Sequence, residues 1–248
     1  LEVLPYLQPL QFDERQIAAA RDRLLAWDGQ MRMESPEAAL FNIFWAKLVE
    51  AAYNDQLPLD RRVSGAHAVS DALYFTLQEP QSVWWDDLRT EGVQEERDAA
   101  LQRALVAAYA TGVAEFGENL DDWRWGALHT ITFENATLGQ SGIGLIESIF
   151  NRGPFPTHGS ESVVQKTCWS VIDPYEVLCI PALRQVIDLS NLDNSRMIHS
   201  VGQSGHPAHP HYDDFIDPWR TFQYHPSNWS RGNAEAGGAQ TLRLEPAP

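Results

Sequence analysis

The chain has 248 residues, enough to bury a sizeable hydrophobic core in one large domain or in one and a half ordinary ones. Hydrophobic residues make up 44% of it and charged residues 21%, which is typical of globular proteins and excludes a collagen-like or disordered chain. A formal net charge of −16 argues against binding to nucleic acid or to an anionic membrane surface, and no apolar run of about 18 residues predicts a membrane span.

The first half of the chain has a helical pattern. In DERQIAAARDRLLAWDGQM apolar residues recur at helical spacing, and Asp13 is the expected N-cap. SPEAALFNIFWAKLVEAAYN has Ser35 as its expected N-cap and Pro36 at the first helical position. Residues 65–79 predict a shorter helix, and residues 95–117 a long one that Gly117 ends. The apolar faces of the first two helices are Ile17, Ala20, Leu24, Leu25 and Trp27, and Leu40, Ile43, Phe44, Leu48 and Ala51. We expect residues 1–118 to form a helical layer.

Strands are expected in the second half. The composition changes near residue 119, and the alternating run HTITF predicts a strand. Further strand candidates are 161–172, 182–190 and 195–203. No linker separates the halves, so a single α+β unit with helices against an antiparallel sheet is the more economical interpretation. In this interpretation residues 119–230 are the strand-rich part, and residues 231–248 are a polar tail whose last residues are expected to be poorly ordered.

The two cysteines, Cys168 and Cys179, flank a turn that contains a proline. Either they pair across a hairpin or they are two separate buried thiols, which is the interpretation that the usual burial of free cysteine favours. Neither their spacing nor their flanking residues match a metal or redox motif.

A histidine-rich segment, GQSGHPAHPHYDD, occupies residues 202–214 and contains His206, His209 and His211. A zinc site needs about four converging ligands. The interleaved prolines should hold the segment extended and spread the imidazoles apart. A rigid loop with hydrogen-bonded histidines is therefore favoured over a metal site.

Other candidate residues have weak signals. Ser204 has only part of a GxSxG nucleophile motif, and Ser141 lacks the lysine of a P-loop, so plain turns are favoured at both. In WRWGALHT a packed aromatic corner of Trp123 and Trp125, with His129 hydrogen-bonded inside it, is favoured over a catalytic histidine. The adjacent carboxylate pairs are interpreted as helix starts or solvated turns. These pairs are Asp86 and Asp87, Asp121 and Asp122, and Asp213 and Asp214.

Several motifs follow one another in a specific order: WGALH at 125–129, GPFP at 153–156, VIDL at 186–189, and the histidine-rich segment followed by Trp219. With the helices before them, these motifs resemble the C-terminal part of the β subunit of the penicillin acylase family over roughly residues 1–230. In one place the chain departs from the family, which commonly has an acidic residue after the glycine of the loop that reads HGSESVV here. The resemblance implies part of an αββα sandwich of the N-terminal-nucleophile hydrolases. It also implies that the histidine-rich segment links a strand to a helix away from the chemistry.

The resemblance implies where the catalytic residues lie. In this family the nucleophile is an N-terminal serine, whose own α-amino group acts as the base. The chain begins with Leu1, and the oxyanion-stabilising asparagine of an NWNN-like segment has no match, since Asn228-Trp229 stands in a different context. We therefore expect both groups on a partner chain and assign no catalytic residue here. No cofactor is expected, although the family allows a structural calcium ion on upstream segments; substrate-binding residues are left open.

The expected function is that of a C-terminal chain in a multi-chain amidohydrolase. Its substrates would be N-acyl compounds such as acylated β-lactams or acyl-homoserine lactones, and its partners the α chain and the N-terminal part of the β chain. Because LEVLPYLQPLQF lacks the basic region of a signal peptide, we expect a soluble chain that is already processed or is a fragment, in the periplasm or outside the cell by family resemblance. The alternative is a non-catalytic binding or structural module with a borrowed acylase fold. A partner chain with an N-terminal Ser, Thr or Cys would distinguish the two.

Overall fold

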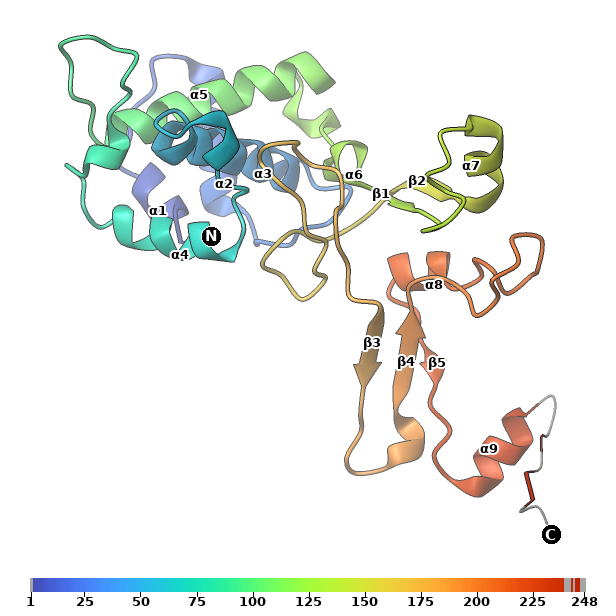
Figure 1. Cartoon of the computed structure of the whole chain (residues 1–248). Helices are drawn as coiled ribbons and strands as arrows, with labels where there is room; N and C mark the ends of the chain where they lie inside the picture. The colour runs from blue at the N-terminus through green and yellow to red at the C-terminus, as the bar shows by residue number, and fades with distance from the viewer. Residues whose placement is uncertain (1, 239–241, 243, 246–248) are drawn as a thin grey trace. The chain divides into compact units, whose positions relative to one another are not determined.

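Figure 1 shows a computed structural model of the chain, which describes residues 2–238, 242 and 244–245. Its contacts divide it into two compact units: unit 1 comprises Leu1–Glu134 and Asn151–Ile180, and unit 2 comprises Asn135–Phe150 and Pro181–Pro248. The predicted mixture of helices and antiparallel strands is confirmed. The domain limits near residues 118 and 230 stay predictions. The expectation for the end of the tail concerns 239–241, 243 and 246–248, which lie outside the described residues.

Unit 1 is built mainly from helices, as the periodicity of the first half predicts. They are α1 (Leu4–Leu7), α2 (Arg15–Ala26), α3 (Pro36–Val49), α4 (His67–Thr76), α5 (Arg97–Phe116) and α6 (Trp125–Leu128). Short helical turns lie at Glu50–Asn54, Leu59–Arg61, Val83–Trp85 and Leu120–Asp122. In the part of the chain that the structure describes, no helix is long and apolar enough to cross a membrane.

Helix α3 lies at the centre of unit 1 and packs against α2, α5 and α6 (Figure 1). Its start is as predicted, because the Ser35 hydroxyl accepts the N–H of Ala38 at 3.0 Å and Pro36 occupies the first turn. Ten of its residues are buried, on all sides of the helix, so it forms the middle of the hydrophobic core rather than one side of a layer.

The predicted start of α2 is wrong by one residue. Glu14, and not Asp13, takes the extended N-cap conformation, and its side chain makes no capping hydrogen bond. Ile17, Ala20 and Leu24 are buried as predicted, but Leu25 is 37% exposed. One residue further along an α-helix is about 100° around its axis, which turns Leu25 away from the core.

Helix α5 ends as predicted at Gly117, whose φ of +86° favours glycine. A second glycine of α5 serves packing. A Cβ on Gly112 would lie 2.0 Å from the ring of Trp123, so only glycine allows this buried indole to lie against the helix.

A two-stranded antiparallel sheet completes unit 1. Strand β1 (Thr130–Phe133) confirms the predicted HTITF strand and pairs with β2 (Arg152–Pro156). The strand predicted at 161–172 is wrong, since only the isolated bridges Ser160–Lys166 and Cys168–Cys179 form there. The reason is that this segment folds back on itself, with Thr167 N–H donating to Ser160 C=O, instead of running beside another strand.

Unit 2 contains a three-stranded antiparallel sheet in the order β3 (Leu183–Val186), β4 (Arg196–His199), β5 (His225–Pro226). Strands β3 and β4 confirm the candidates at 182–190 and 195–203. Its helices are α7 (Gly144–Phe150), α8 (Ile216–Arg220) and α9 (Arg231–Gly237), with a short turn at Leu192–Asn194. The guanidinium of Arg184 on β3 lies over the ring of Trp219 at 4.8 Å and donates to the Trp219 carbonyl, which ties β3 to α8.

Candidate functional site

The candidate histidine of the WGALH motif, His129, lies at the end of α6 in unit 1. Its side chain is fully buried and stacks on Trp125, with the ring centroids 4.4 Å apart. Trp123 is fully buried nearby in sequence. The prediction of a packed aromatic corner around His129 is therefore confirmed for Trp125, whereas the ring contacts of Trp123 are with Tyr109 and Phe116 of α5.

Both ring nitrogens of His129 have a partner. Nδ1 lies 2.6 Å from the carbonyl oxygen of Tyr175, and Nε2 lies 2.7 Å from the hydroxyl of Thr167. A carbonyl can only accept, so Nδ1 carries the proton and Nε2 accepts from the threonine hydroxyl. Burial lowers the pKa of His129 to about 4, against which the bond to Tyr175 C=O acts, so the ring is neutral near pH 7.

The segment 157–171 closes over this corner through backbone contacts. The Trp125 indole N–H donates to Gly159 C=O at 2.8 Å, and Gly159 N–H donates to Met31 C=O at 2.8 Å. Gly159 has a φ of +103°, and a Cβ on it would lie 2.0 Å from Gln165 C=O. Glycine is therefore required at the point where the segment meets α6.

A second polar cluster joins the same segment to α3. The Ser160 hydroxyl donates to Asn42 Oδ1 at 2.8 Å and accepts the Trp169 indole N–H at 3.0 Å, and all three side chains are buried. Sequence reasoning missed this cluster. The only local signal in the sequence is a polar residue, Asn42, among the apolar residues of α3. Periodicity alone does not show that this asparagine is buried or what it binds.

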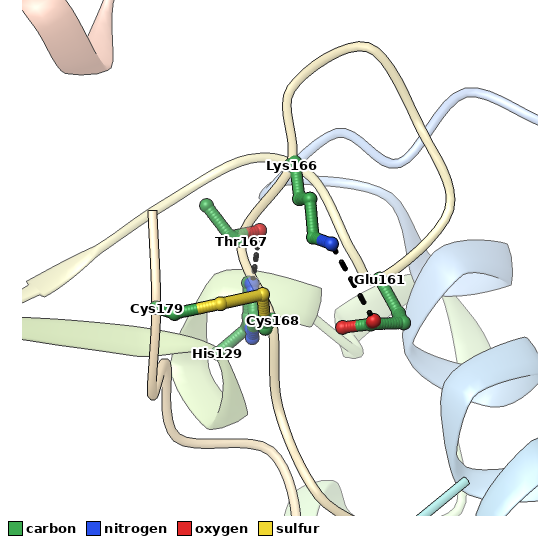
Figure 2. The surroundings of a disulfide bond; sticks show 6 residues. All are labelled: His129, Glu161, Lys166, Thr167, Cys168 and Cys179. Carbon is green, nitrogen blue, oxygen red and sulfur yellow. Dashed lines mark hydrogen bonds and ion pairs between the residues drawn. A yellow bond between two sulfur atoms is a disulfide. The ribbon is translucent and has the colours of Figure 1, made fainter. Parts of the chain in front are cut away.

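A disulfide joins Cys168 and Cys179, whose Cα atoms lie 5.0 Å apart (Figure 2). The favoured interpretation as two separate thiols is wrong. Residues 168 and 179 face each other in an antiparallel bridge, with Cys168 N–H donating to Cys179 C=O at 2.8 Å, and this brings the sulfurs within bonding reach. The disulfide closes the segment that carries Tyr175, the partner of His129.

The buried corner around His129 has a structural role and is not arranged for acyl transfer. The Thr167 hydroxyl is hydrogen-bonded to the neutral His129, which resembles a nucleophile with its base, but both side chains are 0% exposed. A substrate carbonyl has no route to a buried hydroxyl in this arrangement. The corner instead fixes the segment 157–179 on the helices of unit 1.

The histidine-rich segment forms an exposed loop in unit 2 between β4 and α8, in the position that the resemblance implies. His206 and His209 accept backbone N–H groups of Ala208 and His211 through Nδ1, and His211 Nδ1 lies 2.8 Å from Asp214. The rings are thus hydrogen-bonded within their own loop, as predicted. Among the described residues, no group of three or more His, Cys, Asp or Glu side chains could hold a metal ion.

The three adjacent carboxylate pairs differ in how exposed their side chains are. The prediction of a solvated turn is wrong for Asp87, which is 8% exposed and binds Arg89 through both oxygens, at 2.7 and 2.8 Å. This contact lowers the pKa of Asp87 to about 2. Asp121 is exposed, in the short turn Leu120–Asp122, and pairs with Arg23. Asp214 is exposed beside His211.

The two candidate serines lie in turns, as predicted. The Ser141 hydroxyl accepts the N–H of Ile143, and the Ser204 hydroxyl accepts the N–H of His206. Trp229, next to Asn228, donates its backbone N–H to Asp193. None of these contacts brings a serine hydroxyl to a histidine or carboxylate base.

Comparison with known proteins places these observations in a family. The model of the penicillin amidase family matches residues 1–236. The chain is 31% identical over 249 residues to the acyl-homoserine lactone acylase QuiP of Pseudomonas aeruginosa, covering 92% of this chain and 29% of that protein. It is 28% identical over 234 residues to the penicillin acylase 2 proenzyme of Pseudomonas sp. strain SE83, covering 90% of this chain and 28% of that protein.

A solved structure shows a similar fold. The thermostable penicillin G acylase from Alcaligenes faecalis matches with a TM-score of 0.55 at 18% identity, over 100% of this chain and 46% of that chain. The chain thus spans less than a third of the length of the curated relatives it matches, at 29% and 28%. On the match over residues 1–236, the chain belongs to the penicillin amidase family.

Proposed function

We propose that this chain is the C-terminal chain of a multi-chain amidohydrolase that hydrolyses the amide bond of N-acyl compounds. The observation that carries the proposal is the family match over residues 1–236. Relatives are named acyl-homoserine lactone acylases and a penicillin acylase proenzyme, which supports acyl-homoserine lactones or acylated β-lactams as the substrate class.

In this proposal the nucleophile is an N-terminal serine on another chain of the same precursor. Its hydroxyl adds to the amide carbonyl while its α-amino group takes the proton, and the amine leaves after receiving that proton. Water then hydrolyses the acyl-serine to release the carboxylic acid. An oxyanion-stabilising asparagine on the partner chain would bind the negative oxygen of the tetrahedral intermediate.

The role of the present chain is to support that centre. The buried corner around His129 and the polar cluster of Ser160 and Asn42 hold the segment 157–179 firmly on the helices. The partners in this proposal are the α chain and the N-terminal part of the β chain. A relative that is named a proenzyme supports processing into more than one chain. The disulfide supports an oxidising compartment, the periplasm or the cell exterior.

The test is made on the complete protein. We expect N-terminal sequencing of every chain to find a Ser on a partner chain, and the assembly to hydrolyse a chromogenic N-acyl substrate. Replacing that Ser by Ala should abolish hydrolysis without releasing the present chain. Turnover by the present chain alone, or an assembly without an N-terminal Ser, Thr or Cys, would contradict the proposal and favour a non-catalytic module.

We also propose that the histidine-rich loop binds no catalytic metal, since its rings are hydrogen-bonded within the loop. His209→Ala should leave both the metal content of the assembly and its turnover unchanged. A stoichiometric transition metal that is lost in this variant would overturn the idea.

A further inference from the structure

Arg184 on β3 is a partly buried cation of unit 2 that lies among three aromatic rings. Its guanidinium carbon is 4.8 Å from the ring centre of Trp219, 5.4 Å from that of Phe222 and 5.8 Å from that of Tyr224. Helix α8, which carries Trp219, packs against β4 near the start of β3 (Figure 1). Aromatic faces attract a guanidinium, so these three rings, here called the aromatic box, hold the side chain in place.

The guanidinium has more hydrogen-bond donors than the described residues satisfy. Nη2 donates to the carbonyl oxygen of Trp219, and Tyr224 also contacts the cation. Nε and Nη1 are shielded from water and have no hydrogen-bond partner in the described part of the chain. Nε carries one N–H and Nη1 two, so three of the five donors of Arg184 lack an acceptor.

The positive charge of Arg184 has no carboxylate beside it. Burial lowers the pKa of this guanidinium, and among the described residues Tyr224, and no Asp or Glu, acts against that effect. Arg23, in contrast, is paired with Glu37. Carboxylates are not scarce, since the chain has 34 Asp and Glu residues against 18 Lys and Arg. Because a buried charge is unfavourable unless it is paired, Arg184 requires a counter-ion from outside the described residues.

Phe222 is the part of the aromatic box that faces solvent. Trp219 is fully buried, whereas Phe222 is 46% exposed. The backbone of Phe222 has a φ of +58°, which non-glycine residues rarely adopt and which is found at clamps around ligands. A carboxylate from outside therefore reaches the unused N–H groups by displacing the Phe222 ring.

The surroundings of the aromatic box favour an acid carried by a protein over a small free acid. Side chains alternate across a strand, so Val186 lies on the same face of β3 as Arg184, and it is 58% exposed. Among the described strands β3 pairs only with β4, which leaves its other edge open. Arginine and aromatic side chains are enriched at the centres of protein interfaces. A small acid would leave the apolar side chains and the open edge in water.

We propose that Arg184 binds an Asp or Glu side chain of another chain of the assembly, at the centre of an apolar interface. The carboxylate accepts from the N–H groups that lack an acceptor within this chain, while Phe222 and Val186 pack on apolar residues around the acid. This inference rests on the proposed function, because it requires the partner chains, and it adds which residue contacts them and through what chemistry. Salt screens a buried pair little, so the pair is compatible with an assembly that high salt leaves intact.

Carbodiimide cross-linking of Arg184→Lys in the complete assembly tests the contact. The reagent joins the new amine to a touching carboxylate as an amide and takes up the water that is lost, which turns the carbodiimide into a urea. We expect mass spectrometry of the peptides to find position 184 linked to an Asp or Glu of another chain, and no such link in the parent protein. Arg231→Lys is the positive control, since Arg231 lies 2.7 Å from Glu235 and its link should form within this chain.

Loss of the charge should also weaken the assembly. Arg184→Gln leaves the partner's acid buried without a cation, so this chain should be released at a fixed urea concentration at least about tenfold faster. Arg231→Gln, at an exposed arginine, should leave the rate of release unchanged. Arg184→Glu combined with an arginine in place of the linked acid should restore slow release. This rescue distinguishes a contact between chains from a role of Arg184 within unit 2.

Links from position 184 to this chain alone would overturn the proposal, as would no link while the Arg231→Lys control reacts. If Arg184→Lys does not assemble, Phe222→Lys places the amine at an exposed position beside the guanidinium, and the absence of a link to another chain would again contradict the proposal. N-terminal sequencing separates the two possible failures. Without a partner chain both this inference and the proposed function fail, whereas an active assembly without the link contradicts only this inference.

Discussion

At the scale of single residues, the neutral state of His129 links a buried hydrogen bond to the pH dependence of stability. Its pKa of about 4 in the folded protein lies below the value of 6.5 that is usual for histidine. Between these values the unfolded chain binds a proton that the folded protein does not. The free energy of unfolding therefore falls as the pH drops from 6.5 towards 4, and this contribution is fully present above pH 6.5.

We predict that His129→Asn lowers the stability at pH 7 but removes this part of the pH dependence. The loss at pH 7 should be about 2 kcal/mol, because the buried hydrogen bonds of the imidazole to the Thr167 hydroxyl and to Tyr175 C=O are lost together with its stacking on Trp125. Because the parent loses up to about 3 kcal/mol between pH 7 and pH 4 and the variant does not, the advantage of the parent over the variant should disappear at pH 4. Urea denaturation of both proteins at several pH values measures their unfolding free energies. If the two free energies change with pH in parallel, His129 does not titrate in this way.

A single hydroxyl also sets the start of a helix. Ser35 caps α3, whereas Asp13, which precedes α2 by two residues, makes no capping contact. We predict that Ser35→Ala lowers the free energy of unfolding by about 1 kcal/mol and that Asp13→Ala changes it by much less. Chemical denaturation of the two variants side by side checks this. An equal effect of both substitutions would contradict the assignment of the caps.

At the scale of elements, the loop between β2 and β3 has little regular structure and is held by hydrogen bonds and a disulfide along its length. The disulfide joins two residues separated by 11 positions, and the carbonyl of Tyr175 between them anchors His129. Cross-linking restricts the unfolded chain, so its removal makes unfolding more favourable.

We predict that the double substitution Cys168→Ala/Cys179→Ala lowers the free energy of unfolding by about 3 kcal/mol, the loop-closure value for a loop of this length. Near-ultraviolet circular dichroism should report looser packing around Trp125 and Trp169. Adding dithiothreitol should destabilise the parent protein and leave the double variant unaffected. A parent protein insensitive to reduction would contradict this role of the bond.

At the scale of the whole molecule, unit 2 has exposed apolar side chains on and after its edge strand β3. These are Leu183, Val186, Ile187 and Leu189, with exposures of 42%, 58%, 38% and 88%. An edge strand with such side chains is a surface for pairing with another chain. The net charge of −16 argues that apolar packing and strand pairing hold the proposed partners, and not long-range attraction.

We therefore predict that about 1 M NaCl, where screening acts over roughly 3 Å, leaves the assembly intact. Urea should separate the chains and abolish hydrolysis in the same concentration range, because an obligate interface shares its hydrophobic core with the folded chains. Size-exclusion chromatography with activity measurements checks both. Release of a folded, intact chain by salt alone would disprove a shared core.

The sequence by itself determined those features whose cause lies within one or two turns of chain. Ser35 and Pro36 start α3, Gly117 ends α5, and the β-branched runs after residue 181 form strands, because each depends on neighbouring residues. The motifs around WGALH also indicated the family, since their order along the chain is itself a sequence property.

Only the tertiary structure decided the contacts between distant residues. It pairs Cys168 with Cys179 and turns residues 161–172 into a loop where β-branched composition predicts a strand. It also joins Ser160 to Asn42, 118 positions away in sequence. Such contacts depend on which surfaces the packed helices bring together, and local propensity contains no information about that because burial and partners arise only once the chain has folded.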